Sequence, residues 1–483
     1  MNRSYLLIAM GATILQFIIF KLLYPYPDFF SDSYSYLYAA SANLDVNVWP
    51  IGYSKFLRAF HYLTSSDTGL IAFQYFFLEL GALYFFYTIL YFFHPSRNSR
   101  IILCLFLFFN PLFLYICNYV NSDPLFVALS ILWFTQLLWI IYKPAFYQIF
   151  VQAVLLFLAF TVRNNAYYYP FIGGFAFILS KQSIRVKIAG VIMPLLLIIP
   201  FIIHTRNAAF KMTGTHQFSL FTGWQLANNA LYTYTDLDID PDDLPSAQSR
   251  KLDSLSKTFY SQVTPAFSDI LHNYVGNYFI RQRESPLKTY IRNNYKIKNE
   301  YDEVVMWGKA SADFEEYGKY LIKQNPLAYI KDYVLLNSRF YFLPPLEKLE
   351  EYNLGMNDVE SIAQKWFNFK SRHISAVSRN VQGTILFLFP SLFLFINICL
   401  LGCSIWLLLK KGFKDLSASY NRSLIMASLF MIANFIFCIT ATIIVFRYEV
   451  FPLIIGATYS ILLVEAVDPK FNRSETPALI PEI

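Results

Sequence analysis

Charged residues are scarce in this chain. They make up 15% of its 483 residues, whereas a soluble domain typically contains about 25%. Hydrophobic residues reach 56% and aromatic residues 19%. The low charge argues against an ordinary soluble enzyme, and the many aromatic residues exclude intrinsic disorder. Because several apolar runs are long enough to cross a bilayer, the composition indicates a multi-spanning membrane protein.

Several chemical patterns are also missing. The five cysteines all fall inside apolar runs, so we expect small buried side chains rather than a disulfide framework. The six histidines show no metal-ligand spacing, which argues against a zinc site. No glycine-rich phosphate loop is present, which argues against direct use of a nucleotide. No nucleic-acid partner and no definite cofactor are expected.

Ten apolar runs are candidates for membrane-spanning helices, each close to the roughly 20 residues that a hydrocarbon core requires. They are Tyr5–Leu23, Leu70–Phe93, Ile101–Val120, Pro124–Tyr142, Phe146–Val162, Ala166–Ser180, Ile188–His204, Thr384–Leu409, Leu424–Phe446 and Val450–Val464. We therefore predict an all-α polytopic membrane protein with about ten transmembrane helices. The two runs around Arg163 also fit a single broken span.

Basic residues are distributed unevenly between alternate loops. With a cytoplasmic N-terminus, the inside loops carry Arg97, Arg100, Lys143, Lys181, Arg185, Lys187, Lys410, Lys411, Lys414 and Arg422. The short outside segments carry only Arg163 and Arg447 as basic residues. This positive-inside pattern predicts that both termini are cytoplasmic and that residues 24–69 and 205–383 lie outside.

The predicted organisation has three parts. Residues 1–204 form a seven-helix transmembrane catalytic module with the outer loop 24–69. Residues 205–383 form an extracytoplasmic, mostly helical domain, because their charges are mixed in sign and their patterns are amphipathic. Residues 384–483 form the C-terminal transmembrane helices and a cytoplasmic tail. The outer domain contains no cysteine and no Asn-X-Ser/Thr acceptor, which favours a bacterial inner membrane facing a periplasm.

Two carboxylates, Asp28 and Asp32, follow the first span directly, and tyrosines at helical spacing come after them. A partly desolvated carboxylate at the membrane surface has a raised proton affinity and is suited to take a proton from a sugar hydroxyl. The alternative is that Asp32 only caps a helix beginning at Ser33. A further outer turn, Asn121-Ser122-Asp123-Pro124, places Asp123 at the same interface, or else is an ordinary helix start.

Three arginines lie at the predicted outer face: Arg163, Arg206 and Arg447. Arginine binds phosphate oxygens well, so outer cations without an obvious partner indicate an anionic ligand. The alternatives are contact with lipid headgroups, which we favour for Arg206, and a pair between Arg447 and Glu449.

These residues resemble a known family. Asp32-Ser33-Tyr34-Ser35-Tyr36 followed by Pro50-Ile51-Gly52-Tyr53 is similar to the first outer loop of GT-C glycosyltransferases, the polytopic enzymes related to protein O-mannosyltransferases and the lipid A aminoarabinose transferase. Asn121-Ser122-Asp123, the turn Arg163–Pro170 and Arg447-Tyr448 resemble later segments of that family. The resemblance covers residues 1–204 and 446–452. The acidic pair of the mannosyltransferases is absent, because Ser33 follows Asp32.

The resemblance implies an inverting glycosyltransferase that moves a sugar from a polyprenyl-phosphate donor to a hydroxyl of a glycan, lipid or protein on the outer face of the membrane. Asp32 would be the general base, Asp28 and Asp123 would orient the acceptor or help hold a divalent cation, and Arg163, Arg447 and Arg206 would bind the lipid phosphate. Contacts to the sugar or lipid would come from Tyr34, Tyr53, Lys55, Asn164, Tyr168 and Tyr448. Membrane lipids are the remaining expected partner.

Two other classes of protein stay open. An O-antigen polymerase or ligase also acts on lipid-linked sugars, but it depends on arginines of outer loops rather than on an aspartate after the first span. A transporter is expected to show inverted repeats and charges at mid-membrane, whereas here the charges cluster at the outer interface.

Overall fold

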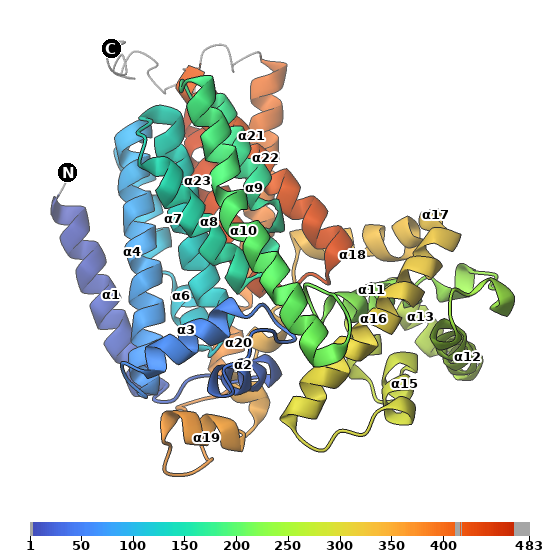
Figure 1. Ribbon diagram of the computed structural model, residues 1–483. Coiled ribbons are helices and arrows are strands. Elements are labelled where there is room, and N and C mark those ends of the chain that lie inside the picture. The colour runs from blue at the N-terminus through green and yellow to red at the C-terminus, as the bar shows by residue number, and fades with distance from the viewer. Residues whose placement is uncertain (1–2, 411–415, 417, 468–483) are drawn as a thin grey trace.

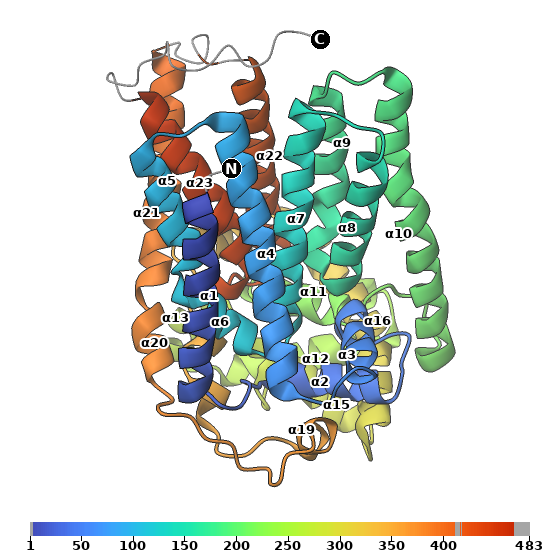
Figure 2. The ribbon, with the colours of Figure 1, turned by 90° about the vertical axis from the view of Figure 1, so that its left-hand side faces the viewer.

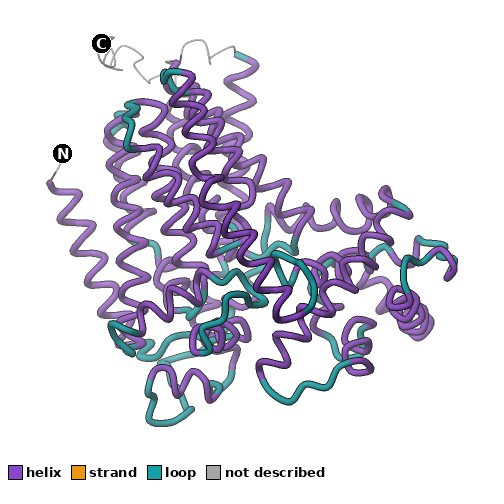
Figure 3. The backbone as a smooth tube through the Cα atoms, viewed as in Figure 1, coloured by secondary structure: helices purple, strands orange, loops and turns teal. Residues whose placement is uncertain are grey.

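The structure is a computed structural model that describes residues 3–410, 416 and 418–467 (Figure 1). In this part of the chain every regular element is a helix, and no strand is present (Figure 3). Eight of the helical segments are long and apolar enough to cross a membrane. The chain is therefore a helical multi-pass membrane protein, as its composition predicts.

The apolar runs form one bundle (Figure 2). Its helices are α1 (Arg3–Leu23), α4 (Asp67–Phe93), α5 (Arg97–Phe108), α6 (Pro111–Asn118), α7 (Ser122–Tyr142), α8 (Gln148–Val162), α9 (Tyr169–Leu179), α10 (Ile184–Thr213), α20 (Val381–Leu386), α21 (Leu388–Leu409), α22 (Ala418–Ala441) and α23 (Val450–Val467). Helix α7 is the most enclosed of the long helices, with neighbours that include α4, α8 and α9. It has no polar face, because it is surrounded by other helices instead of water.

Two of the ten predicted spans are shorter than expected. The runs on either side of Arg163 form α8, with 15 residues, and α9, with 11 residues, whereas a full span needs roughly 20. Arg163 has an extended backbone, and Asn164–Tyr168 form a 3-10 turn, so the chain leaves the helical path between the two. The described residues therefore contain eight helical segments of spanning length, and the prediction of about ten is corrected.

The two ends of the bundle differ. Helix α1 begins and α23 ends on the same side, where the links α4–α5, α7–α8 and α9–α10 also lie (Figures 1 and 2). The opposite end carries α2 (Ser31–Ser41), α3 (Gly52–His61) and the long segment between α10 and α20 (Figure 1). We call residues 214–380 the cap. The sequence boundary at residue 204 falls inside α10, because this helix continues past its apolar part to Thr213.

The cap has a hydrophobic core of its own that includes Trp224, Phe279 and Phe314. Its helices are α11 (Thr222–Leu231), α12 (Ala247–Gln262), α13 (Pro265–Asn273), α14 (Tyr278–Arg281), α15 (Pro286–Asn294), α16 (Glu300–Gln324), α17 (Pro326–Tyr329), α18 (Leu335–Phe342) and α19 (Ser361–Phe367). Helix α11 lies directly on α16 because Gly223 has no side chain: a Cβ there would lie 1.8 Å from the Ser311 carbonyl oxygen. This close packing fixes the cap wall that faces α2.

Candidate functional site

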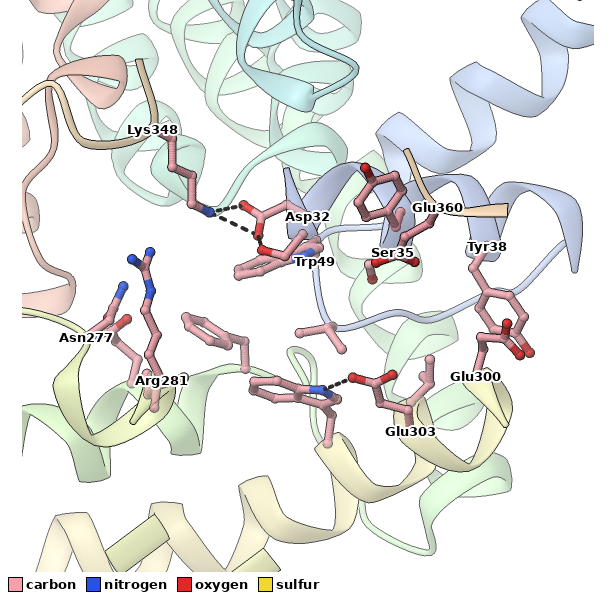
Figure 4. A pocket seen from close by; sticks show the side chains of 18 of the residues that line it. Asp32, Ser35, Tyr38, Trp49, Asn277, Arg281, Glu300, Glu303, Lys348 and Glu360 are labelled. Atoms are coloured by element: carbon pink, nitrogen blue, oxygen red, sulfur yellow. Dashed lines mark hydrogen bonds and ion pairs between the residues drawn. The ribbon is translucent and has the colours of Figure 1, made fainter. Parts of the chain in front are cut away.

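A cavity of about 410 Å³ lies between α2, the loop that follows it and the cap (Figure 4). Its lining comes from three distant parts of the chain: residues 31–49, the cap and residues 442–448 of the α22–α23 link. The cavity brings together Asp32 from α2, Lys348 from the cap and Arg447 from the link. These three side chains are buried at the inner wall.

Asp32 lies in the first turn of α2 but does not cap the helix. The N-cap residue is Phe30, whose N–H donates to the Ser33 hydroxyl at 3.2 Å. The Asp32 carboxylate instead accepts hydrogen bonds from the Lys348 ammonium at 3.2 and 3.3 Å. The alternative in which Asp32 only caps a helix beginning at Ser33 is therefore wrong, and its carboxylate belongs to the cavity wall.

Five charged side chains form one chain of contacts, which we call the charge chain. Arg163 pairs with Asp123, Asp123 accepts from Arg447 at 3.2 Å, Arg447 lies 3.6 Å from Asp32, and Asp32 lies 3.2 Å from Lys348. Each of these side chains is at most 12% exposed. Three cations against two carboxylates leave one excess positive charge within the charge chain, and the nearby Glu347 carboxylate, which pairs with the exposed Arg281, offsets part of it. The charge chain is thus suited to an anion that enters from the cavity.

The cations set the protonation of Asp32. Burial by itself raises the pKa of this carboxyl, but Lys348 and Arg447 together outweigh burial and hold the pKa below its ordinary value. The raised proton affinity that the sequence predicts for Asp32 is therefore wrong, because the prediction did not include the cations beside it. Burial lowers the pKa of Lys348 to about 8, although Asp32 acts in the opposite direction.

Arg163 reaches the charge chain because of how α8 ends. The Arg163 backbone is extended, with φ −150° and ψ 145°, and the Arg163 guanidinium lies 4.5 Å from the centre of the Tyr448 ring. Gly52 brings α3 against the same end of α8, since a Cβ on Gly52 would lie 2.5 Å from the Thr161 carbonyl oxygen. The glycine of the Pro-Ile-Gly-Tyr segment is therefore a packing requirement beside the charge chain.

Arg447 is the predicted arginine that lines the cavity, whereas Arg163 reaches it only through Asp123. The alternative partner of Arg447, Glu449, is fully buried and accepts a hydrogen bond from the Asn434 amide at 2.9 Å. Arg447 turns the other way, to Asp32 and Asp123. The sequence alternative that pairs Arg447 with Glu449 is therefore wrong.

Lys348 and Arg281, both from the cap, line the cavity although no pattern in the sequence singles them out. The residue before Lys348, Glu347, has a left-handed backbone with φ 53° and pairs with Arg281 at 2.5 Å. The Tyr119 hydroxyl donates to the Lys348 carbonyl at 2.6 Å, which fixes the cap loop to the bundle. The Lys348 ammonium also lies 4.3 Å from the centre of the Phe30 ring, so it contacts both this ring and the Asp32 carboxylate.

Asp28 lies outside the cavity lining. Its N–H donates to the Asn118 carbonyl at 2.8 Å, and its own carbonyl accepts from the Val120 N–H at 3.1 Å. Its carboxylate accepts from the Asn353 N–H at 2.8 Å, and burial raises its pKa to about 7. Asp28 therefore ties the first loop to the bundle and the cap, and the predicted role in orienting an acceptor does not fit this position.

The residues do not fit a divalent cation. Asp123 is occupied by Arg163 and Arg447, whose charges would repel a metal ion, and Asp28 is buried elsewhere. Among the residues that the structure describes, no three His, Cys, Asp or Glu side chains gather as metal ligands. The predicted cation-assisting role of Asp28 and Asp123 therefore has no structural support.

The other predicted contact residues divide into two groups. Tyr34 and Tyr448 line the cavity. The remaining four, Tyr53, Lys55, Asn164 and Tyr168, do not line it, and neither does Arg206, which is predicted to bind the lipid phosphate. Tyr53 and Tyr168 donate hydrogen bonds to Gln74 and Asn434 inside the protein, and Lys55 pairs with Asp45 on the surface. Arg206 is exposed on α10 and does not lie with Arg163 and Arg447, the other arginines predicted to bind the lipid phosphate.

A second cavity, of about 350 Å³, adjoins the first at Asn277 and Arg281. Apolar side chains from the cap and the α22–α23 link make up much of its lining: Phe267, Ile270, Leu271, Val275, Phe340, Ile443, Ile444 and Val445. A largely apolar pocket, whose lining also includes Glu347 and Glu350, thus lies directly beside the cations of the main cavity.

The main cavity has two chemically different ends. Figure 4 shows Lys348 and Arg281 on one side of Asp32, and Glu303, Glu300 and Glu360 on the other. We call these the cationic end and the acidic end. Asp32 lies between them, so a ligand at either end can reach its carboxylate.

The fold and the site define a multi-pass helical membrane protein with a two-ended charged cavity at one end of its bundle. The chain matches no protein-family profile, and searches of curated proteins and of solved structures find no similar protein.

Proposed function

We propose that this protein is an inverting glycosyltransferase of the GT-C type, which moves a sugar from a polyprenyl-phosphate donor to an acceptor hydroxyl at the outer face of the membrane. The observation that carries the proposal is the charge chain: a buried cluster with more cations than carboxylates, of which Asp32, Lys348 and Arg447 line a cavity at the end of the bundle. A phosphodiester supplies the missing negative charge. Nucleotide sugars are confined to the cytoplasm, so an outer-face transferase needs a lipid-linked donor.

The reaction needs one bond to form and one to break. The acceptor oxygen attacks the anomeric carbon of the donor from the face opposite the phosphate, which inverts that carbon, and the bond from the anomeric carbon to the phosphate oxygen breaks. The hydroxyl proton goes to Asp32, and the electron pair of the broken bond goes to the lipid phosphate. Lys348 and Arg447 stabilise the charge that develops there. Of the three candidate carboxylates, Asp32 is the one that lines the cavity.

Lys348 and Arg447 couple proton transfer to Asp32 with departure of the lipid phosphate. In the resting site Lys348 and Arg447 contact Asp32 and keep its pKa low, so the carboxylate is ionised but a weak base. As the phosphate leaves, its negative charge grows and it competes for both cations. Weaker contacts between Asp32 and these cations raise the pKa of Asp32. The base therefore becomes stronger at the stage when the acceptor proton has to move.

The lipid part of the donor also has a suitable place. The apolar pocket shares Arg281 with the cationic end and is lined by Ile443, Ile444 and Val445 of the link between two membrane helices. An isoprenoid chain lying there would leave the membrane beside α22 and bring its phosphate to Arg281 and Lys348. Burial of the chain against these side chains supplies binding energy away from the reacting atoms.

The proposal is tested with the full-length protein in proteoliposomes. Synthetic polyprenyl-phosphate pentoses and hexoses are offered as donors, and release of polyprenyl phosphate is followed together with the anomeric configuration of the product. We expect release from at least one donor and an inverted product. Retention of configuration, or no release from any donor, would contradict the proposal.

One observation keeps the polymerase or ligase alternative in view: Arg281 comes from the cap and lines the cavity, and such enzymes depend on arginines of outer loops. Two variants separate the readings. Full activity of Asp32→Asn together with loss of activity in Arg281→Ala would favour the alternative, whereas a larger loss in Asp32→Asn supports the transferase with an aspartate base.

A further inference from the structure

The acidic end of the cavity has a wall of aromatic rings. Trp49 comes from the loop after α2, and Phe221 and Trp307 come from the cap. The Trp49 and Phe221 ring centres lie 4.7 Å apart, and those of Phe221 and Trp307 lie 6.0 Å apart. All three rings are only partly buried, so part of each remains open to a ligand. We call these residues the aromatic wall.

Carboxylates lie along the edge of the aromatic wall. The Trp307 indole N–H donates to the Glu303 carboxylate at 3.5 Å, and Glu303 and Glu360 both face the cavity in Figure 4. Glu303 and Glu360 are exposed and keep free lone pairs that can accept hydrogen bonds. Tyr34 and Tyr38 add hydroxyl groups to the same end. The rings of the aromatic wall thus lie next to the hydrogen-bond acceptors Glu303 and Glu360.

This combination selects among possible acceptors. A sugar ring has an apolar C–H face and a rim of hydroxyls, which match a ring face and its neighbouring carboxylates. A lipid acceptor would need a continuous apolar lining, whereas the acidic end carries Glu300, Glu303 and Glu360. Pairing with a strand, one common way to bind an extended peptide, is not offered by the described part of the chain, which contains no strand.

We propose that the acceptor is a saccharide, which stacks on the aromatic wall and donates hydroxyl hydrogen bonds to Glu303 and Glu360 while its reacting hydroxyl points to Asp32. This inference rests on the proposed function for the direction of transfer, but the binding itself does not depend on catalysis. The lipid donor then occupies the cationic end, and the two substrates meet at Asp32.

Lys288 also lines the cavity and lies against the aromatic wall. Its ammonium lies 5.3 Å from the ring centres of both Trp224 and Trp307, and the Trp224 indole N–H donates to the Trp307 carbonyl at 3.0 Å. The Trp224 ring centre also lies 4.0 Å from that of Trp307, so the Trp307 ring is packed in place on α16 before any saccharide binds.

The test is binding of the full-length, detergent-solubilised protein to a printed array of defined oligosaccharides of glucose, galactose, mannose, rhamnose and their N-acetylated forms. We expect the wild type to be retained by at least one of these saccharides. Trp307→Ala should weaken that binding roughly tenfold, which corresponds to about 1.4 kcal/mol of lost ring contact, and Trp307→Phe should restore most of it. The control is Trp406→Ala, because Trp406 is exposed on α21 and does not line the cavity.

Two results would overturn the inference: no retention of the wild type by any saccharide on the array, or retention that Trp307→Ala leaves unchanged. Saccharide binding without sugar transfer in proteoliposomes would instead leave the inference standing and contradict the proposed function. Transfer to a lipid or a peptide at the wild-type rate in Trp307→Ala would support the proposed function and reject a saccharide as the acceptor.

Discussion

The cationic and acidic ends of the cavity hold their charges in different ways. At the cationic end Lys348 and Arg447 are almost fully buried and contact Asp32, with side-chain exposures of 10% and 8%, while Arg281 at the same end is exposed and pairs with Glu347. At the acidic end Glu300, Glu303 and Glu360 are exposed. A buried charge is strong and fixed in position, whereas an exposed carboxylate exchanges readily between water and ligand hydroxyls. The first arrangement suits tight binding of one phosphate, and the second suits recognition through several weak contacts.

Removing the Asp32 charge, which lies between the two ends, should have the largest effect on the transfer rate. Asp32→Asn deletes the proton acceptor, so we expect the transfer rate to fall by about 10²–10⁴-fold, while the donor binds at least as tightly because Lys348 and Arg447 lose a competing carboxylate. Asp45→Asn is the matched control, because Asp45 lies in the loop after α2 but pairs with Lys55 on the surface. Steady-state transfer in proteoliposomes measures both. A rate for Asp32→Asn within threefold of the control, with the protein still folded, would remove Asp32 from the mechanism.

Removing a cation from the cationic end should raise the KM of the donor and leave the KM of the acceptor unchanged. Arg281→Ala removes a cation from the border of the two cavities, and we expect the KM for the lipid donor to rise about tenfold, since a hydrogen bond to a charged group contributes about 1.5–3 kcal/mol. The control is Arg283→Ala, an exposed arginine two residues away that does not line either cavity. A rise in the KM of the acceptor instead of the donor would reverse the assignment of the two ends.

The pH dependence of donor binding should follow the loss of the proton from the Lys348 ammonium. Its pKa is about 8, so its positive charge is present below this pH and is lost as the pH rises through it. We therefore expect donor affinity to fall above about pH 8 in the wild type, and Lys348→Arg, which stays charged, to move the fall upward by at least one pH unit. Equilibrium binding of polyprenyl phosphate across the pH range tests this. Identical profiles for the two proteins would mean that Lys348 does not hold the phosphate.

The smallest effect is expected at the acidic end. Glu303→Gln keeps the shape of the side chain but removes its charge, and the loss of about 1 kcal/mol of hydrogen bonding should raise the KM of the acceptor about fivefold. The KM of the donor should stay the same. Glu315→Gln is the control, because Glu315 lies on the same helix and pairs with Lys319 away from the cavity. Equal effects of Glu303→Gln on both substrates would show that the two ends are not independent.

Much of the fold follows from the sequence, but the site follows only in part. The apolar runs predict the membrane helices because burial in lipid demands long apolar segments, and only the runs beside Arg163 are too short. The sequence predicts that Asp32, Asp123 and Arg447 share one face, and they meet in the charge chain. Lys348 was not predicted, because it lies 316 residues from Asp32 in a segment of mixed charge. Without this partner the sequence predicts the wrong direction for the pKa of Asp32.

The most direct test of the central claim is a density map of the purified, full-length protein with polyprenyl phosphate bound. We predict a phosphate within hydrogen-bonding distance of Lys348 and Arg447, beside Asp32, with its isoprenoid chain along Ile443–Val445. A bound lipid phosphate at any other place, or a cavity that stays without the lipid at saturating concentration, would contradict the account.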